Sequence, residues 1–202
     1  MKVIPREARK QSFTQLQYRL IIGSILGDGG LVPTGGGKRF RLTISHSDRQ
    51  KHYLFWKHSL LKEYVGTPPT FYEPTNAWTL RTLSSEEFTK LRTLFYRGKQ
   101  KIVPNAIKKM IVNPFVLAVW YMDDGNIRRE YGKVYGMILN SHSFSKDDNR
   151  KLSKWIEESH GIKSMLQRNH GRYRLYFGSN SWKRFNALIM PYVLPSMQYK
   201  LS

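Results

Sequence analysis

The chain has 202 residues, of which 40% are hydrophobic, and it carries 34 lysines and arginines against 14 aspartates and glutamates. This length and hydrophobic content allow one packed domain or two small ones. The sequence has no cysteine, which excludes disulfides and thiolate metal sites. No stretch approaches the roughly 20 apolar residues of a membrane span, and the first residues lack the apolar core of a secretory signal.

The net charge of +20 indicates a polyanionic partner, because so much like charge repels itself unless it is neutralised. The basic residues are spread along the chain rather than gathered in a tail, which predicts an extended basic face on a folded domain. Nucleic acid is the leading partner and an anionic lipid surface the second. Charge alone also fits a structural RNA-binding protein, so another feature must decide the function.

The first predicted helix covers residues 12–26, where polar and apolar residues alternate before the sequence becomes wholly apolar. Gly23 and Gly27 are four residues apart and share one helix face, where small residues allow another helix to approach closely. Residues 32–38, VPTGGGK, are expected to form a flexible loop at a hairpin tip. Their glycines lack the spacing of a phosphate-binding loop, so that function is not predicted here.

Residues 38–47 alternate in polarity and predict a half-buried strand. Leu42 and Ile44 face one way, whereas Arg41, Thr43 and Ser45 face the other. The polar face can contact DNA, or it can simply face solvent.

The rest of the first half predicts a helix, a hairpin and a second helix. Residues 48–65 are amphipathic, with Asp48 as the expected cap. A hairpin is expected over residues 71–83, and Ser84 or Ser85 caps the helix that follows. The first half therefore reads helix, two strands, helix, two strands, helix.

The second half repeats this order after a basic stretch at 97–104. The expected elements are a short helix at 104–110, a buried helix at 114–124, a strand at 133–143 with a possible bulge at Gly136, a helix at 145–160, a hairpin at 164–177 turning at 169–171, a helix at 181–190, and a tail that carries Lys200.

Two short motifs repeat along the chain at one offset. IIGSILGDG ends in Asp28 and Gly29, and LAVWYMDDG ends in Asp124 and Gly125, 96 residues later. Ser-His-Ser at 45–47 recurs at 141–143, again 96 residues later. The shared offset indicates a duplicated unit. We therefore predict an α+β chain with an N-terminal half at 1–96, a basic connector at 97–113 and a C-terminal half at 114–202.

The repeated acids stand where a helix should end. Asp123 and Asp124 close a buried helix that stops at Gly125, and a helix C-terminus carries partial negative charge. Carboxylates there need a divalent metal or a lysine for compensation. Packing the two duplicated helices together would bring Asp28 and Asp124 side by side, as oxygen ligands of the kind that Mg²⁺ prefers. Beside a basic face this suggests metal-assisted phosphodiester hydrolysis, although a single Asp-Gly pair is more often an ordinary turn.

IIGSILGDG and LAVWYMDDG resemble the two signature motifs of the LAGLIDADG homing endonucleases. KIVPNAIKKMIVNPFVLAVWYMDDG, LNSHSF and the C-terminal PYVLPSMQYKL extend the resemblance to the single-chain branch of that family, over residues 15–201. It implies two αββαββα halves related by a pseudo-twofold axis. Their motif helices pack at the centre, and their two antiparallel sheets form a saddle over DNA. Both final acids are present, although the motifs depart from the consensus at Ser24, Gly27, Val119, Trp120 and Tyr121.

The resemblance also implies roles for particular residues. The final acids Asp28 and Asp124 are the metal ligands and catalytic acids, with Mg²⁺ as the ion and Mn²⁺ as a substitute. Asp123 is secondary, because motif 1 has Gly27 at that position. Lys101 and Lys200 match the active-site lysines of the family.

The water-positioning residue of the first half falls at Ser45, where the family has a longer acidic side chain, so this role is open. His46 and His142 are alternatives, or plain strand histidines. The side chains expected to contact DNA lie on or beside strands of both halves: Lys38, Arg39, Arg41, Thr43, Ser45, Arg172 and Arg174.

Three functions are compatible with these features. The first is a monomeric, site-specific, Mg²⁺-dependent endonuclease that cuts a long double-stranded DNA target and spreads an intron or intein. It would act inside the cell, in a bacterial or phage-encoded setting or in an organelle matrix. The second is a splicing maturase on the same fold that binds intron RNA. The third is a catalytically inactive DNA-binding regulator, which the intact acids and lysines disfavour.

Overall fold

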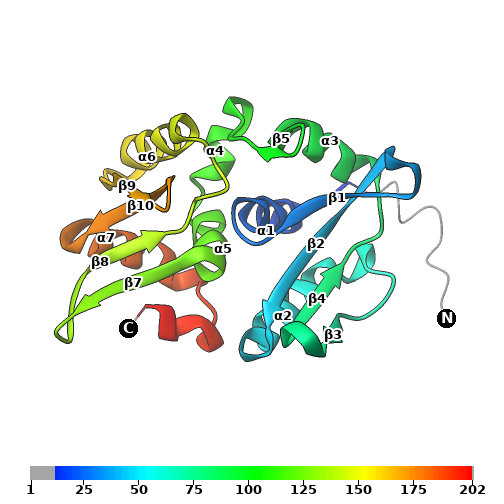
Figure 1. Ribbon diagram of the computed structural model, residues 1–202, viewed down its shortest axis with the longest axis horizontal. Helices are drawn as coiled ribbons and strands as arrows, with labels where there is room; N and C mark the ends of the chain where they lie inside the picture. The colour runs from blue at the N-terminus through cyan, green and yellow to red at the C-terminus, as the bar shows by residue number, and fades with distance from the viewer. Residues whose placement is uncertain (1–11, 202) are drawn as a thin grey trace. The chain divides into compact units, whose positions relative to one another are not determined.

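A computed structural model describes residues 12–201, and the chain divides into two compact units, Met1–Leu94 and Phe95–Ser202. Figure 1 labels most of the helices and strands, which are numbered in chain order. The first unit ends two residues before the expected boundary at 96. Residues 97–113, expected as a separate connector, belong to the second unit.

The first unit has the expected order of helix, two strands, helix, two strands, helix. The elements are α1 (Gln15–Leu26), β1 (Gly30–Thr34), β2 (Arg39–Ser47), α2 (Lys51–Leu61), β3 (Thr70–Tyr72), β4 (Ala77–Arg81) and α3 (Glu86–Phe95). The strands form one antiparallel sheet in the order β1-β2-β4-β3. Helix α2 packs against β2 and β4.

Helix α1 begins at a capping box. The Thr14 hydroxyl accepts from the Gln17 N–H at 3.2 Å, and the Gln17 side chain accepts from the Thr14 N–H at 2.9 Å. These bonds satisfy two N–H groups that would otherwise be exposed at the helix start. Beyond this point the segment from Leu20 to Leu26 is buried, as its apolar sequence predicts.

Strand β2 has the predicted two faces. Leu42 and Ile44 are fully buried, whereas Arg41 and Thr43 are half-buried and Ser45 is exposed. Because α2 covers the apolar side, the other side of the sheet presents arginine and hydroxyl groups.

Two local predictions for the first unit were wrong. Residues 32–34 are not a loop, because they pair with β2 as part of β1; only Gly35–Gly37 form the turn. Asp48 does not cap α2, because a 3₁₀ turn precedes the helix and the Asp48 carboxylate instead accepts from the Trp78 indole at 2.7 Å. Ser85 does cap α3, since its hydroxyl accepts from the Phe88 N–H at 3.2 Å.

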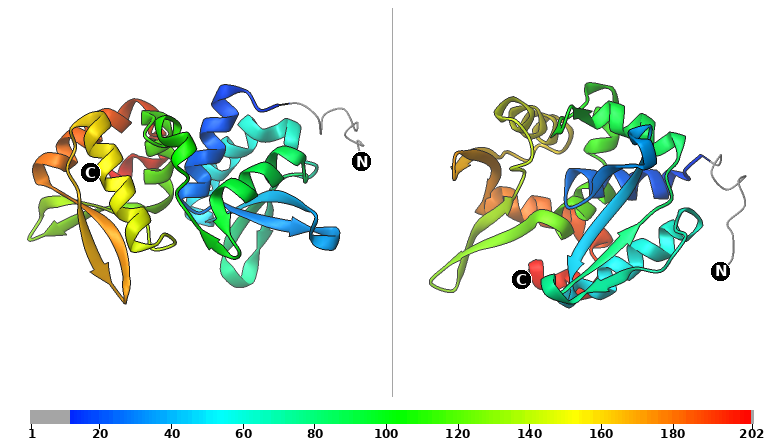
Figure 2. Two further views of the ribbon diagram at one scale, coloured as in Figure 1. Left: turned by 90° about the horizontal axis from the view of Figure 1, so that it is seen from above. Right: turned by 45° about the vertical axis from the view of Figure 1, so that its right-hand side comes forward.

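The second unit contains a repeat of this pattern after a short lead. The elements are β5 (Tyr96–Arg97), β6 (Gln100–Lys101), α4 (Lys108–Ile111), α5 (Pro114–Asp124), β7 (Gly125–Glu130), β8 (Lys133–Leu139), α6 (Lys146–His160), β9 (Met165–Asn169), β10 (Arg172–Gly178) and α7 (Ser179–Ile189). The sheet order β7-β8-β10-β9 has the same connectivity as the first sheet. Helices α6 and α7 pack against this sheet (Figure 2).

Helix α5 begins at Asn113, whose side chain accepts from the Phe115 N–H at 3.1 Å, and Pro114 takes the first position, where no N–H is needed. Its residues from 116 to 122 are all fully buried. The helix ends before Gly125 as predicted, but glycine is needed there for space and not for a left-handed backbone. Gly125 is extended rather than left-handed, and a Cβ there would lie 2.1 Å from the Tyr121 ring.

The strand predicted at 133–143 is shorter than expected and contains the predicted irregularity. The register between β7 and β8 shifts next to Gly136, whose φ of 155° suits glycine. The strand ends at Leu139, because the chain turns and the buried Ser141 hydroxyl donates to Asn149 at 2.5 Å. The β9–β10 hairpin turns at His170 and Gly171, both with positive φ, within the predicted turn.

The lead-in and tail of the second unit are both packed. The Val103 N–H donates to Asp148 at 3.3 Å, and Lys151 donates to the Val103 carbonyl at 3.0 Å. The tail forms two 3₁₀ segments, Met190–Tyr192 and Pro195–Lys200. Across residues 12–201, none of the helices is both long and apolar enough to cross a bilayer.

Candidate active site

In the second unit, a lysine holds the end of the motif helix. The Nζ of Lys200 donates to the carbonyl oxygens of Met122 at 2.6 Å and Asp123 at 2.9 Å. These carbonyls belong to the last turn of α5, which carries the negative end of the helix dipole. The positive charge predicted at this end is therefore supplied, at least in part, by Lys200.

Tyr121 fixes the segment that carries Lys200. Its hydroxyl donates to the Lys200 carbonyl at 2.5 Å, and its ring stacks on Trp182 with centroids 5.7 Å apart. Burial raises the pKa of the Tyr121 hydroxyl, so it remains a donor at any physiological pH. The motif helix thus donates a hydrogen bond to the C-terminal segment and also accepts hydrogen bonds from it.

The two acids of motif 2 differ in exposure. The whole Asp123 residue is only 8% exposed, whereas Asp124 is half-buried. The Asp124 carbonyl accepts two bonds from Asn140, from its N–H at 3.1 Å and from its side-chain amide at 3.0 Å. Asn140 was not predicted as a site residue. Its only signal in the sequence is a polar side chain directly after an apolar strand.

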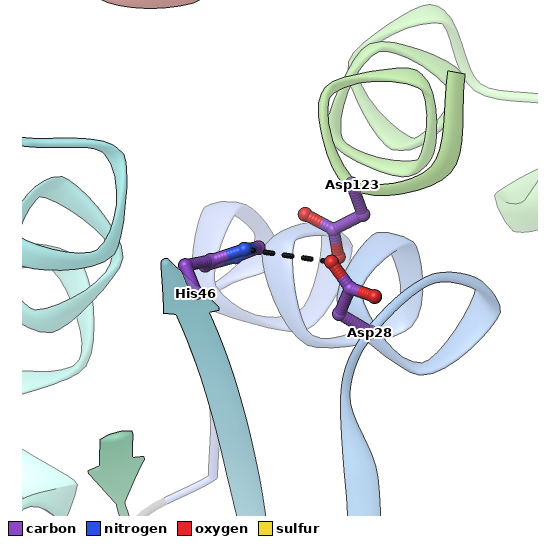
Figure 3. Close-up of side chains that lie close together, drawn as sticks. All are labelled: Asp28, His46 and Asp123. Atoms are coloured by element: carbon purple, nitrogen blue, oxygen red, sulfur yellow. Dashed lines mark ion pairs between the residues drawn. The ribbon is translucent and has the colours of Figure 1, made fainter. Parts of the chain in front are cut away.

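In the first unit, Asp28 lies beside a histidine (Figure 3). The Nδ1 of His46 is 3.4 Å from the Asp28 carboxylate; the His46 side chain is 1% exposed and that of Asp28 is 38% exposed. The His46 ring also packs on Tyr53, with ring centroids 4.9 Å apart. His46 is therefore a buried histidine of β2 whose Nδ1 lies beside the acid of motif 1.

The two motifs end differently. In motif 1 the Gly29 N–H donates to the Ser24 carbonyl five residues back, at 2.6 Å. In motif 2 the Gly125 N–H donates to Tyr121, four residues back. Asp28 therefore lies two residues beyond the end of α1, whereas Asp124 is the last residue of α5.

This difference changes which residues correspond between the units. Gly30 pairs with Thr43, and Gly125 pairs with Leu139. Counting along each ladder towards the acid places Ser45 opposite Asp28 and Asn140 opposite Asp124. The counterpart of Ser45 is therefore Asn140 rather than Ser141. The repeated Ser-His-Ser motif occupies different places in the two units, and His142 lies in the turn after β8.

The predicted DNA-contacting residues of the first unit lie on or beside β2. Lys38 and Arg39 are exposed at its start, and Ser45 hydrogen-bonds Thr79 of β4 across the outer face at 2.9 Å. Thr43 Oγ1 and Arg41 Nε are buried and make no hydrogen bond within the described part of the chain.

The predicted residues of the second unit lie on β10. Arg174 donates to Gln167 at 2.9 Å and to the Asn140 side chain at 3.4 Å. Asn140 in turn donates to Asn126 at 2.9 Å. A series of hydrogen-bonded polar side chains therefore runs across the outer face of this sheet to Asn140, which bonds to the Asp124 carbonyl. Arg172 lies at the hairpin turn and is exposed.

Lys101 lies on β6, opposite Tyr96. It lines a pocket of the second unit together with Arg172 and His142. Lys200 and Lys101 therefore have different surroundings within the second unit.

In each unit, taken by itself, the acids of the motif suit a hard divalent cation. Asp28, Asp123 and Asp124 offer carboxylate oxygens, which Mg²⁺ and Mn²⁺ prefer. Asp123 and Asp124 lie at the negative end of a buried helix, where electrostatics favours an added cation. Asp28 and Asp124, the predicted metal ligands, are both accessible enough to bind an ion that keeps several waters.

Most of the sequence matches one protein family. The model of the LAGLIDADG DNA endonuclease family matches residues 18–185, and the chain belongs to that family.

The relatives cover most of the chain. DNA endonuclease I-ChuI of Chlamydomonas applanata is 31% identical, over 95% of this chain and 96% of that protein. Cytochrome b mRNA maturase bI2 of Debaryomyces hansenii is 28% identical, over 90% of this chain and 72% of that protein. The structure of the homing endonuclease I-WcaI bound to its DNA recognition sequence matches with a TM-score of 0.88, at 24% identity, over 98% of this chain and 91% of that one. This last likeness concerns the fold.

Proposed function

We propose that the chain is a site-specific endonuclease that hydrolyses phosphodiester bonds in both strands of double-stranded DNA, with Mg²⁺ as the natural ion and Mn²⁺ as a substitute. The observation that carries the proposal is the end of α5, where Lys200 binds the last carbonyls of a buried helix beside two consecutive aspartates. Membership of a DNA endonuclease family and the similarity to I-ChuI support it.

Each motif acid has a proposed task. Asp28 and Asp124 each hold a metal ion for one DNA strand. A bound divalent ion supplies a lowered pKa for water and shields the charge on phosphate. Lys200 and Lys101 stabilise the negative charge that develops on the phosphate. Asn140 holds the backbone at Asp124, and His46 orients Asp28.

The sheet faces supply recognition. Arg39, Arg41 and Thr43 in the first unit, and Arg172 and Arg174 in the second, offer donors for phosphates and base edges. One chain holds both motif copies, so we propose that it acts as a monomer. Its DNA substrate places its action inside the cell or an organelle.

A second candidate is splicing of intron RNA. The relative named as a cytochrome b mRNA maturase favours it, and a basic sheet face also suits RNA.

One experiment separates these candidates. A supercoiled plasmid carries the uninterrupted sequence that flanks the coding frame, and the control plasmid carries the same sequence split by the insertion. The proposal expects linear product from the first plasmid with Mg²⁺ or Mn²⁺ and none after chelation. Splicing of the precursor RNA without any plasmid cleavage would instead establish the maturase.

A further inference from the structure

A basic pocket of about 670 Å³ opens on the second unit. It lies where the β5–β6 hairpin, the turn before α6 and the β9–β10 turn meet. Its cationic side chains are Lys99 and Lys101 from the hairpin, Lys146 from α6 and Arg172 from β10. Among the described residues that line it, none carries a carboxylate.

The nearest acids in the sequence are engaged elsewhere. Asp147 is bound to Arg150 at 2.8 Å. Asp148 is buried and accepts from Ser145 at 2.9 Å and from Lys151 at 3.2 Å. Both acids of the first turn of α6 are therefore paired with cations that do not line the pocket.

His142 lines the same pocket, and Arg172, one of the cations of the pocket, contributes to the pKa shift of its imidazole. Burial lowers the pKa of the His142 imidazole, and the neighbouring Arg174, Arg172 and His170 lower it further. The Asn169 amide lies 3.2 Å from Nε2 of His142, where an amide N–H donates to a neutral imidazole. The part of this shift that is due to neighbouring cations has the sign expected where an anion is attracted.

We infer that Lys99, Lys146 and Arg172 of this pocket bind one phosphate of the DNA backbone, next to the cutting-site phosphate that Lys101 is proposed to stabilise. The inference rests on the proposed function, which supplies the polyanion. Arg172 joins the pocket to the outer face of the second sheet, so a duplex on that face extends naturally to the pocket. When the phosphate enters, His142 takes a proton from solvent and the Asn169 amide turns its oxygen to accept it.

The charged groups that line the pocket with His142 or act on its pKa come from three elements. Lys99 and Lys101 belong to β5–β6, Lys146 belongs to α6, and His170, Arg172 and Arg174 belong to β9–β10. Since all of these side chains are cationic or become so on protonation, only an incoming anion favours the charged imidazole.

The first test is the salt dependence of DNA binding by the full chain, without metal, on target duplex. The double variant Lys99→Ala/Lys146→Ala should reduce the slope of log K against log salt by about 0.9, the value for one phosphate. This corresponds to roughly a 3.5-fold smaller loss of affinity between 50 and 200 mM salt.

The matched control is Lys154→Ala/Lys163→Ala, which also removes two positive charges from the second unit but at lysines that do not line the pocket. Those lysines are exposed and lie 3.7 Å from Glu158 and 3.8 Å from Glu157. Their loss should leave the slope unchanged. An equal reduction in both double variants, or none in either, would overturn the pocket assignment.

The second test is proton uptake, measured as the affinity of wild type and His142→Asn between pH 7.5 and 5.5. Wild type should gain more affinity as the pH falls, by up to about tenfold per pH unit for one proton. Identical pH profiles would show that His142 takes no part. Wild-type linearisation of the plasmid in the same preparation keeps the two questions apart, because a chain that neither binds nor cuts DNA fails the proposed function itself.

Discussion

The Nζ of Lys200 donates a hydrogen bond of 2.9 Å to the carbonyl oxygen of Asp123, so a side chain near the C-terminus holds the end of the motif helix. Together with the bond to Met122, this places one positive charge on two helix carbonyls. Charged hydrogen bonds of this kind contribute about 1.5–3 kcal/mol each when measured by mutation. The contact therefore stabilises the end of the motif helix, and we expect its loss to affect cleavage as well.

We expect Lys200→Met to lower the free energy of unfolding by about 2 kcal/mol and to slow cleavage without abolishing it. Tyr121→Phe is the control, because it removes the bond to the Lys200 carbonyl but keeps the ammonium. It should cost about 1 kcal/mol and leave cleavage near the wild-type rate. Thermal unfolding and single-turnover cleavage measure the two effects. Equal slowing in both variants would mean that the charge of Lys200 has no catalytic role.

Substitution of the motif acids should abolish DNA cleavage while DNA binding is retained. Asp28→Asn and Asp124→Asn should each abolish double-strand cleavage, because an amide keeps the shape but loses the charge that holds a metal. DNA affinity without metal should be unchanged or stronger, since a carboxylate near phosphate is repulsive. Asp123→Asn should be milder. The central assignment fails if both main variants linearise the plasmid at the wild-type rate.

Asn140→Ala should impair one strand more than the other. Its side chain holds the Asp124 carbonyl in the second unit only. The expected product on a supercoiled plasmid is nicked circle that accumulates before linear DNA appears. Asn126→Ala is the control, because Asn126 contacts the Asn140 amide but not Asp124. If Asn140→Ala yields linear DNA with wild-type kinetics, the bond does not position Asp124.

Gly125→Ala should destabilise the second unit. A Cβ there would lie 2.1 Å from the Tyr121 ring and 2.5 Å from its carbonyl oxygen, so the helix end must shift. Overpacking of this kind costs about 1–3 kcal/mol. Gly30→Ala, at the start of β1, meets no atom within 4 Å and should be tolerated. Denaturant unfolding of both variants checks the difference, and equal midpoints would contradict it.

Acidification should destabilise the free protein partly through His142. The pKa of this imidazole is lowered from its usual 6.5, first by burial and then by neighbouring cations. Below pH 6.5 the unfolded chain therefore binds a proton that the folded chain refuses, and stability is lost as the pH falls. His142→Asn should lose less thermal stability than wild type between pH 7 and 5.5. A parallel decline in both proteins would exclude this contribution.

The sequence alone determined the order of the elements, the duplication and the positions of the two repeated acids, because these depend on local patterns. The apolar runs before Asp28 and Asp124 predicted buried helices, and the alternation around Leu42 predicted a strand. Helix starts were also readable where a cap acts over three residues, as at Ser85. Each of these signals lies within one element.

Tertiary structure decided what depends on register and on contacts between distant segments. Five-residue and four-residue turns close the two motifs, so Asn140 rather than Ser141 corresponds to Ser45, a shift that the repeated Ser-His-Ser motif concealed. Lys200 reaches the end of α5 across 77 residues of chain. Such bonds form only when packing brings separate elements together, and no local pattern records which lysine meets which carbonyl.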